Sequence, residues 1–171
     1  MTIQLLDYRK NPSQLRKSGK KFDVSELQTI VTSEEFQQQL EKMKEILTLD
    51  GVGLAATQVG WEVQLFMLCI DEAGNKIEPQ VFLNPEILQY SKGEEKMEEG
   101  CLSFPGLFVK IKRPQTITWK FNTLDGKERT VESSGFYARA VQHETDHCHG
   151  RVFIDRASNI QRMKVKKWLK S

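Results

Sequence analysis

The stretch that decides the fold of this chain is Gln142-His143-Glu144-Thr145-Asp146-His147, which holds two of the three histidines. It has the pattern HExxH. In a helix, residues i and i+4 lie on one face about one turn apart, so the imidazoles of His143 and His147 can bind one metal ion. Glu144 would lie beside that ion, where its carboxylate can take a proton from water. The pattern predicts a metal-dependent hydrolase built on a helix.

The flanking residues favour that helix. Ser133 or Ser134 can cap its N-terminus, Gly150 follows at a position that favours a left-handed residue, and no proline interrupts. Residues at i, i+4, i+7 and i+11 form an otherwise apolar face, which we expect to be buried. These residues are Phe136, Ala140, His143 and His147.

Two histidines do not hold a metal firmly, so a third protein ligand is expected. No glutamate follows His147, and the longer pattern HExxHxxGxxH has Phe153 at its last position. Asp155 is the one acidic residue downstream and is a weak candidate. Cys101 follows a glycine in a charged region, where an accessible thiolate is favoured over a structural thiol. These residues favour an upstream ligand without deciding it.

The composition is that of a soluble globular protein. The 171 residues fit one domain, spanning 1–171, and the net charge of +2 gives no reason to expect specific DNA binding. The cysteines Cys69, Cys101 and Cys148 are few and odd in number, which favours a reducing compartment, and Cys69 is expected in the core. Neither a signal peptide nor a membrane-spanning run is present, so we expect the cytoplasm.

The chain is predicted to begin with an arm followed by helix. Residues 1–22 are rich in lysine and arginine and are expected to form a solvated extended arm. Helix should follow from Asp23, with capping boxes at Ser25 and Thr32, and should end near Asp50-Gly51. One apolar stripe marks its buried face, with Phe36, Leu40, Met43 and Leu47.

A run of small residues then precedes the strands. In residues 51–60 two glycines flank Val52, which allows close approach of backbone or ligand, and the run lacks the ending of a phosphate loop. Gln58 is its one amide side chain, and considered alone it is more typical of a structural amide.

Strands are predicted between the run of small residues and the HExxH helix. Strands are expected at residues 63–70 and 80–83, and Asn84-Pro85 is expected to break the chain before a strand at 87–90. An acidic turn should follow, with Glu94, Glu95, Glu98 and Glu99. Further strands are expected at 109–111, 116–122 and 129–132. Asp125-Gly126 predicts a hairpin turn between the last two. From Ser158 a short docked helix is expected, with Ile160, Met163 and Trp168 on the core.

Three stretches together resemble the signature motifs of the peptide deformylases in order and spacing. They are Gly51-Val52-Gly53-Leu54-Ala55-Ala56-Thr57-Gln58, Glu99-Gly100-Cys101-Leu102-Ser103 and the HExxH stretch. The resemblance implies an α+β fold with the HExxH helix packed between antiparallel β-sheets. It also implies removal of the formyl group from N-formylmethionyl peptides, with Fe²⁺ as the metal and Zn²⁺, Ni²⁺ or Co²⁺ able to replace it.

The same resemblance implies roles for single residues. Cys101, His143 and His147 would be the ligands, and Glu144 the proton acceptor and later the donor to the leaving amine. The Gln58 side chain and the Leu102 backbone N–H would stabilise the oxyanion. The substrate would be bound by Val52, Gly53, Met97, Glu99, Gly100, Phe136 and Ala140. Asp146 would face a cation, for which we predict Arg113.

Some features depart from the family or leave alternatives open. Many members have an arginine seven residues after the ligand cysteine, where this chain has Phe108. The basic residues between Arg162 and Lys170 suggest contact with ribosomal RNA, and the alternative is a docked, solvated helix.

Two other functions compete with deformylase activity. They are an HExxH endoprotease and an inactive deformylase-like binding protein.

Overall fold

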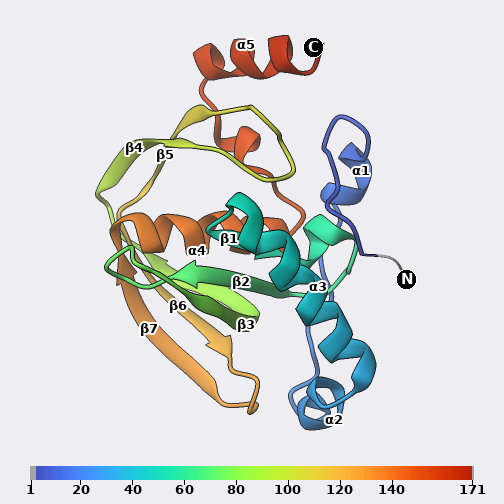
Figure 1. Cartoon of the computed structure of the whole chain (residues 1–171). Helices are drawn as coiled ribbons and strands as arrows, with labels where there is room; N and C mark the ends of the chain where they lie inside the picture. Colours follow the sequence, from blue (N-terminus) through green and yellow to red (C-terminus); the bar gives the residue numbers. More distant parts are fainter. Residues whose placement is uncertain (1–2, 171) are drawn as a thin grey trace.

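The computed structural model describes residues 3–170, so the expected domain of residues 1–171 includes three residues outside the described part. The chain forms a five-stranded antiparallel sheet in the order β1-β2-β3-β6-β7 and a separate two-stranded sheet, β4-β5 (Figure 1). In chain order the elements are α1 Pro12–Leu15, α2 Leu27–Val31, α3 Glu34–Asp50, β1 Gly53–Ala55, η1 Ala56–Val59, β2 Leu65–Ile70, β3 Lys76–Tyr90, β4 Glu94–Glu99, β5 Val109–Pro114, β6 Thr116–Asn122, β7 Glu128–Ser134, α4 Gly135–Cys148, η2 Phe153–Arg156 and α5 Asn159–Trp168.

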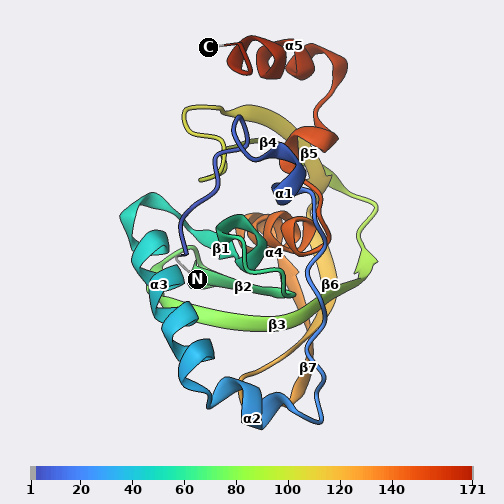
Figure 2. The same cartoon turned by 90° about the vertical axis from the view of Figure 1, so that its right-hand side faces the viewer.

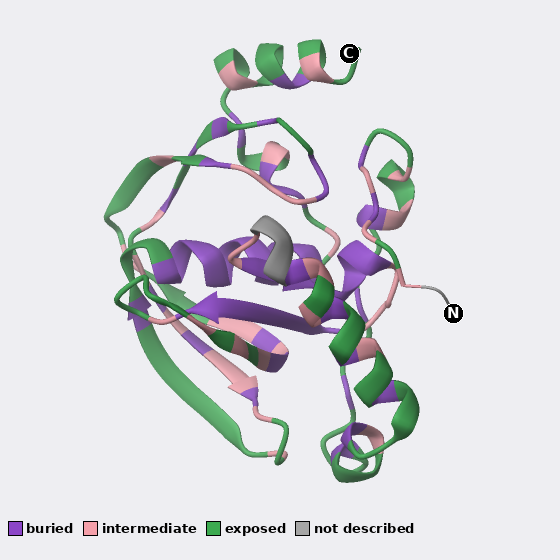
Figure 3. Cartoon of the chain, in the orientation of Figure 1, coloured by how far each residue is buried: buried purple, intermediate pink, exposed green. Residues whose placement is uncertain are grey.

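The HExxH helix is α4, and it lies between the two sheets, as predicted (Figure 1). Every residue from Tyr137 to Cys148 is buried (Figure 3). On one side Ala138 and Val141 pack in a cluster with Phe66 and Trp119 of the large sheet. On the other side α4 meets β5, where Arg139 donates to the carbonyl of Ile111. The helix is therefore held rigidly from both sides.

The ends of α4 follow the sequence signals in part. Ser134 is the N-cap residue, although its side chain makes no capping hydrogen bond. Gly150 has φ of 70°, the left-handed conformation expected of it. Phe136 departs from the predicted buried face, because its side chain is 44% exposed.

Helix α3 is long and amphipathic, as its pattern predicted. Its stripe of Phe36, Leu40, Met43 and Leu47 is buried in one core cluster, and the helix ends at Asp50. The predicted caps are displaced. Ser33 rather than Thr32 caps α3 by accepting from the Phe36 N–H at 3.3 Å. Ser25 caps no helix and donates to Asp23 instead.

The predicted break at Asn84-Pro85 is wrong, because β3 runs through it. Asn84 takes a positive φ of 49°, and the pairing with β6 shifts between Leu83 and Glu86. The Asn84 side chain accepts from the Phe22 N–H at 2.8 Å and donates to the Phe22 carbonyl at 3.0 Å. The bulge, which hydrogen bonds to Phe22 hold in place, thus allows the strand to contain the proline.

The predicted acidic turn is also wrong, because Glu94–Glu99 forms strand β4. Each of its residues pairs with β5, and two of its glutamates lie near lysines there: Glu98 is opposite Lys110, and Glu94 forms an ion pair with Lys112 at 2.6 Å. Cross-strand pairs of opposite charge stabilise a sheet. The lysines of β5 therefore supply the positive charges that the acidic run lacks by itself.

The hairpin of β6 and β7 agrees with the sequence. The strand predicted at residues 116–122 is β6, and the one predicted at 129–132 lies within β7. The turn between them is closed by the Thr123 N–H, which donates to the Lys127 carbonyl at 2.9 Å, and Gly126 has φ of 81°.

The N-terminal segment is not the solvated arm that was predicted. Leu6, Tyr8 and Leu15 are buried, and they pack in one cluster with Val152 and Phe153. After α1 the segment runs down the molecule to α2 (Figure 2). Its apolar residues are few among the lysines and arginines, and for that reason the local composition wrongly predicted that the segment is exposed to solvent.

The predicted tail helix is α5, which Ser158 caps by accepting from the Gln161 N–H. It docks through Val165 and Trp168, whereas Ile160 and Met163 are 73% and 66% exposed, contrary to expectation. No helix among residues 3–170 combines the length and apolar character needed to span a membrane.

Candidate metal centre and substrate cleft

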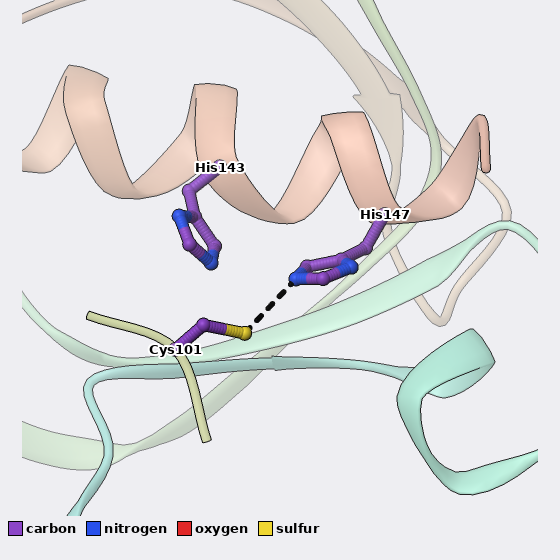
Figure 4. A group of neighbouring side chains, drawn as sticks. All are labelled: Cys101, His143 and His147. Atoms are coloured by element: carbon purple, nitrogen blue, oxygen red, sulfur yellow. Dashed lines mark hydrogen bonds between the residues drawn. The ribbon is translucent and has the colours of Figure 1, made fainter. Parts of the chain in front are cut away.

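Three side chains that could hold a metal ion converge at the C-terminal half of α4 (Figure 4). The helix presents His143 and His147 one turn apart, and Cys101 approaches from the turn after β4. The Cys101 Sγ lies 3.3 Å from His147 Nε2. One ligand atom from each of the three residues lies within 4.8 Å of the other two. No other such group is found in the described part of the chain.

The chemistry of these donors fits a divalent transition metal. A thiolate with two imidazoles suits Fe²⁺ or Zn²⁺ and disfavours Mg²⁺ or Ca²⁺. The Nδ1 of His143 lies 3.1 Å from Glu99 Oε2, so its Nε2 is left for the site. Burial lowers the pKa of His147 well below its usual value, whereas for His143 burial is outweighed by Cys101 and Glu99, which raise the pKa of that imidazole. Asp155, the downstream candidate, instead pairs with Arg16 at 2.8 Å.

Glu99 anchors a buried ion-pair network behind His143. It accepts from Arg113 Nε at 2.7 Å and from Arg139 Nη1 at 2.6 Å. Burial alone would raise the pKa of Glu99, but hydrogen bonds from His143 and Arg113 hold that pKa well below its usual value. An ionised Glu99 therefore fixes the orientation of the His143 ring.

Asp146 belongs to the same network, and the predicted pairing with Arg113 is confirmed. Arg113 Nη1 lies 2.7 Å from Asp146 Oδ2. Arg156 adds two hydrogen bonds to Asp146, at 2.7 and 2.6 Å, which the sequence did not suggest. Arg113 is fully buried, so these carboxylates compensate a charge that would otherwise be costly inside the protein.

Glu144 lies beside the three candidate ligands. It is buried, and burial raises the pKa of its carboxyl to about 7. Its Oε2 makes no hydrogen bond to any described residue, which leaves that oxygen for a water or substrate atom. Gly53 is close, because a Cβ added there would lie 2.6 Å from Glu144 Oε1. A side chain at this point of β1 would press on the Glu144 carboxylate.

The amide of Gln58 is held in one orientation by three neighbours. Its Oε1 accepts from the Ala55 N–H at 2.9 Å. Its Nε2 donates to Ser103 Oγ at 3.2 Å and lies 3.4 Å from Cys101 Sγ. The amide N–H₂ is therefore directed toward the candidate metal centre.

A cleft of about 640 Å³ opens at this centre. The residues from the sequence prediction that line it are Val52, Gly53, Gln58, Glu99, Gly100, Cys101, Leu102, Phe136, Ala140, His143 and Glu144. Met97 does not line it, because its place is farther along β4, opposite Ile111. Glu98 lines the cleft instead, and so does the turn from Phe104 to Phe108, of which only Phe108 was singled out in the sequence.

A family model described as polypeptide deformylase matches residues 5–163. The chain belongs to this family. A peptide deformylase of Agrobacterium fabrum is 41% identical over 122 residues, covering 71% of this chain and 72% of that protein. One from Stenotrophomonas maltophilia is 41% identical over 140 residues, covering 81% of each.

Solved deformylase structures share the fold. The structure from Thermotoga maritima has a TM-score of 0.76 and 36% identity, covering 92% of this chain and 99% of that chain. A mutant of peptide deformylase 1B from Arabidopsis thaliana has a TM-score of 0.84 and 29% identity, covering 98% and 87%.

The activity follows from membership of the family. The protein is a metallohydrolase that removes the N-terminal formyl group from newly synthesised polypeptides. In this deformylase the three motifs, which are far apart in sequence, meet at α4. The turn itself, residues 104–107, had one usable sequence signal, since Pro105-Gly106 is a typical turn pair, and Gly106 has φ of 75°.

Proposed function

We propose that Cys101, His143 and His147 are the metal ligands of this deformylase, with Fe²⁺ as the ion and Zn²⁺, Ni²⁺ or Co²⁺ as replacements. The observation that carries the proposal is the convergence of these three donors beside a buried carboxylate in a cleft. When bound, a divalent ion supplies Lewis-acid activation of water and of the formyl carbonyl.

The protein's own groups then move the proton. Glu144 accepts a proton from the attacking water and later delivers it to the leaving amine. A pKa near the working pH suits a group that must do both. Glu144 is buried but lines the cleft, so its carboxylate faces the place where the water and the substrate would bind.

Two donors stabilise the negative charge that develops on the formyl oxygen. We assign them to the Gln58 Nε2 and the Leu102 backbone N–H, both from residues that line the cleft. The Ala55 and Ser103 contacts keep the Gln58 amide from rotating, so it is oriented before the substrate arrives.

The substrate is a formylmethionyl peptide in extended conformation. The backbone of Gly51 to Gly53 and that of Gly100 serve as its strand-like partners, which their small size permits. The methionine side chain occupies the part of the cleft formed by Val52, Phe136 and Ala140. Glu99 acts behind this pocket, by orienting His143.

The test combines metal analysis with turnover. Protein prepared without oxygen should contain about one metal ion per chain and hydrolyse formyl-Met-Ala, releasing formate. Cleavage of internal peptide bonds would instead indicate an endoprotease, and metal binding without turnover would indicate an inactive relative. Higher activity with Zn²⁺ than with Fe²⁺ under anaerobic conditions would overturn the assignment of iron.

We also propose that α5 contacts the ribosome. The helix exposes Arg162, Lys164, Lys166 and Lys167, and its exposed Ile160 and Met163 lie among them. Such a basic surface would attract RNA phosphates in a salt-dependent manner. A chain ending at Ala157 should then cosediment less with ribosomes at low salt. Equal cosedimentation of both forms would contradict the contact.

The docked part of α5 predicts a second effect of that truncation. Trp168 stacks on Phe104 at 5.4 Å and donates to the Pro105 carbonyl, so its loss should lower thermal stability. The variant Lys164→Glu/Lys167→Glu, which keeps Val165 and Trp168, separates ribosome binding from folding.

We further propose that the chain acts as one domain in the cytoplasm. Its three cysteines are all unpaired, and a thiol ligand needs a reducing compartment. Fractionation of cells that produce the protein tests the location.

A further inference from the structure

Phe108 has an unusual position at the rim of the cleft. It lines the cavity, yet its side chain is 53% exposed, while its neighbour Leu107 is buried. The strand register pairs Glu99 with Val109, and one further step places Gly100 opposite Phe108. A Cβ on Gly100 would lie 2.6 and 2.8 Å from two ring carbons of Phe108. The ring therefore rests on the Gly100 backbone, next to Cys101.

The placement of the substrate brings its second residue to this ring. An extended peptide advances about 3.3 Å per residue, with side chains on alternate sides. In the proposed placement the formyl group is at the metal centre, and the methionine side chain points toward Phe136 and Ala140 of α4. The next side chain then points away from α4, toward the open side of the cleft, where the half-exposed Phe108 ring lies beside Gly100.

The charges around the ring favour one class of side chain. Arg139 is the one arginine or lysine among the residues that line the cleft, and its donors already bind Glu99, the Ile111 carbonyl and the Glu95 carbonyl. Glu98 is exposed and also lines the cleft. An acidic side chain there would meet the apolar ring of Phe108 and the carboxylate of Glu98. No cation that is free to pair with it lies among the residues that line the cleft.

We propose that Phe108 is a specificity-determining residue, which selects substrates with an apolar or aromatic residue directly after formylmethionine. The inference rests on the proposed placement of the substrate. Stacking on the half-exposed ring removes apolar surface from water on both partners. The free energy of aromatic pairs of this kind corresponds to a preference of about 3- to 10-fold in kcat/KM.

The test measures kcat/KM for formyl-Met-X-Ser, where X is Gly, Ala, Leu, Phe or Glu. The wild type should prefer Phe and Leu over Gly by about 3- to 10-fold and should disfavour Glu. Phe108→Ala should lose the preference, and Phe108→Tyr should retain it. Phe108→Arg should reverse the order of Phe and Glu. Tyr90→Ala is the matched control, because Tyr90 is 49% exposed and does not line this cleft.

The formyl-Met-Gly-Ser substrate separates this inference from the proposed function. If it is hydrolysed and wild type and Phe108→Ala rank the other substrates alike, the role of Phe108 is refuted and the deformylase mechanism stands. A preference that depends on Phe108 only in the series formyl-Met-Ala-X also overturns the proposal, because the ring then contacts the third residue. Absence of turnover in the metal-loaded wild type would refute both.

Discussion

The contact between Gly53 and Glu144 allows a substitution that perturbs the proton acceptor without touching a ligand. In Gly53→Ala the new Cβ would lie 2.6 Å from Glu144 Oε1, 2.9 Å from Glu144 Cδ and 2.8 Å from Leu68 Cδ2. Ordinary contact begins at 3.4 Å, so the carboxylate must move by about 0.8 Å, the difference between 3.4 and 2.6 Å. Because β1 is paired along β2, the backbone has little freedom to move instead.

The displacement gives the size of the expected effect. A shift approaching 1 Å in a reacting group costs on the order of 10²-fold in rate, so kcat should fall by about 10- to 100-fold. Overpacking of this kind costs about 1–3 kcal/mol of stability. For a chain of this length each kcal/mol lowers Tm by about 2–4 °C. The metal content should stay the same, since the substitution faces Glu144 and Leu68.

The assay is kcat and KM for formyl-Met-Ala-Ser, measured with metal content and Tm on the same preparation. Gly93→Ala is the matched control, because its Cβ would meet only the end of the exposed Gln115 side chain, at 3.0 Å. A kcat within about twofold of the wild type in fully metal-loaded Gly53→Ala would refute the reasoning. So would a loss of activity that follows loss of metal.

Three further substitutions test the assigned roles. Glu144→Gln should keep the metal and lose turnover by about 10²- to 10⁴-fold, because the proton acceptor is gone; unchanged turnover would show that another base acts. Cys101→Ser should weaken metal retention in a chelator titration, since a neutral hydroxyl is a poorer ligand than a thiolate; full occupancy and activity would place the third ligand elsewhere. Ser103→Ala removes an acceptor of the Gln58 amide and should lower kcat about 2- to 10-fold at constant metal content, and a change in KM alone would contradict an orienting role.

Local patterns predicted the elements whose signals lie close together in sequence. The β6–β7 hairpin follows from alternating strand formers around Asp125-Gly126, and α3 follows from a stripe at helical spacing. Helix α4 follows from its apolar face and Gly150. In each case the residues that decide the structure are within a few turns or one hairpin of each other, so propensity and pattern agree with the final fold.

Predictions failed where a distant segment supplied the stabilising partner. Strand β3 continues through Asn84-Pro85 because Phe22, far away in sequence, takes the hydrogen bonds of Asn84. The acidic run is strand β4 because lysines of β5 lie opposite it. Leu6 and Tyr8 are buried in a segment predicted to be solvated, and their backbone N–H groups donate to the carbonyls of Gln58 and Ser103 at 2.9 Å.

The sequence by itself determined the helix with two imidazoles and a carboxylate on it, since the spacing in HExxH is a property of one helix. It also identified Cys101 as the favoured third ligand, through its motif. Only the tertiary structure decided that Glu99 holds His143 rather than simply lining a pocket, and that Phe108 rests on Gly100. These contacts join separate elements, and their geometry depends on how the sheets pack against α4, which no local pattern encodes.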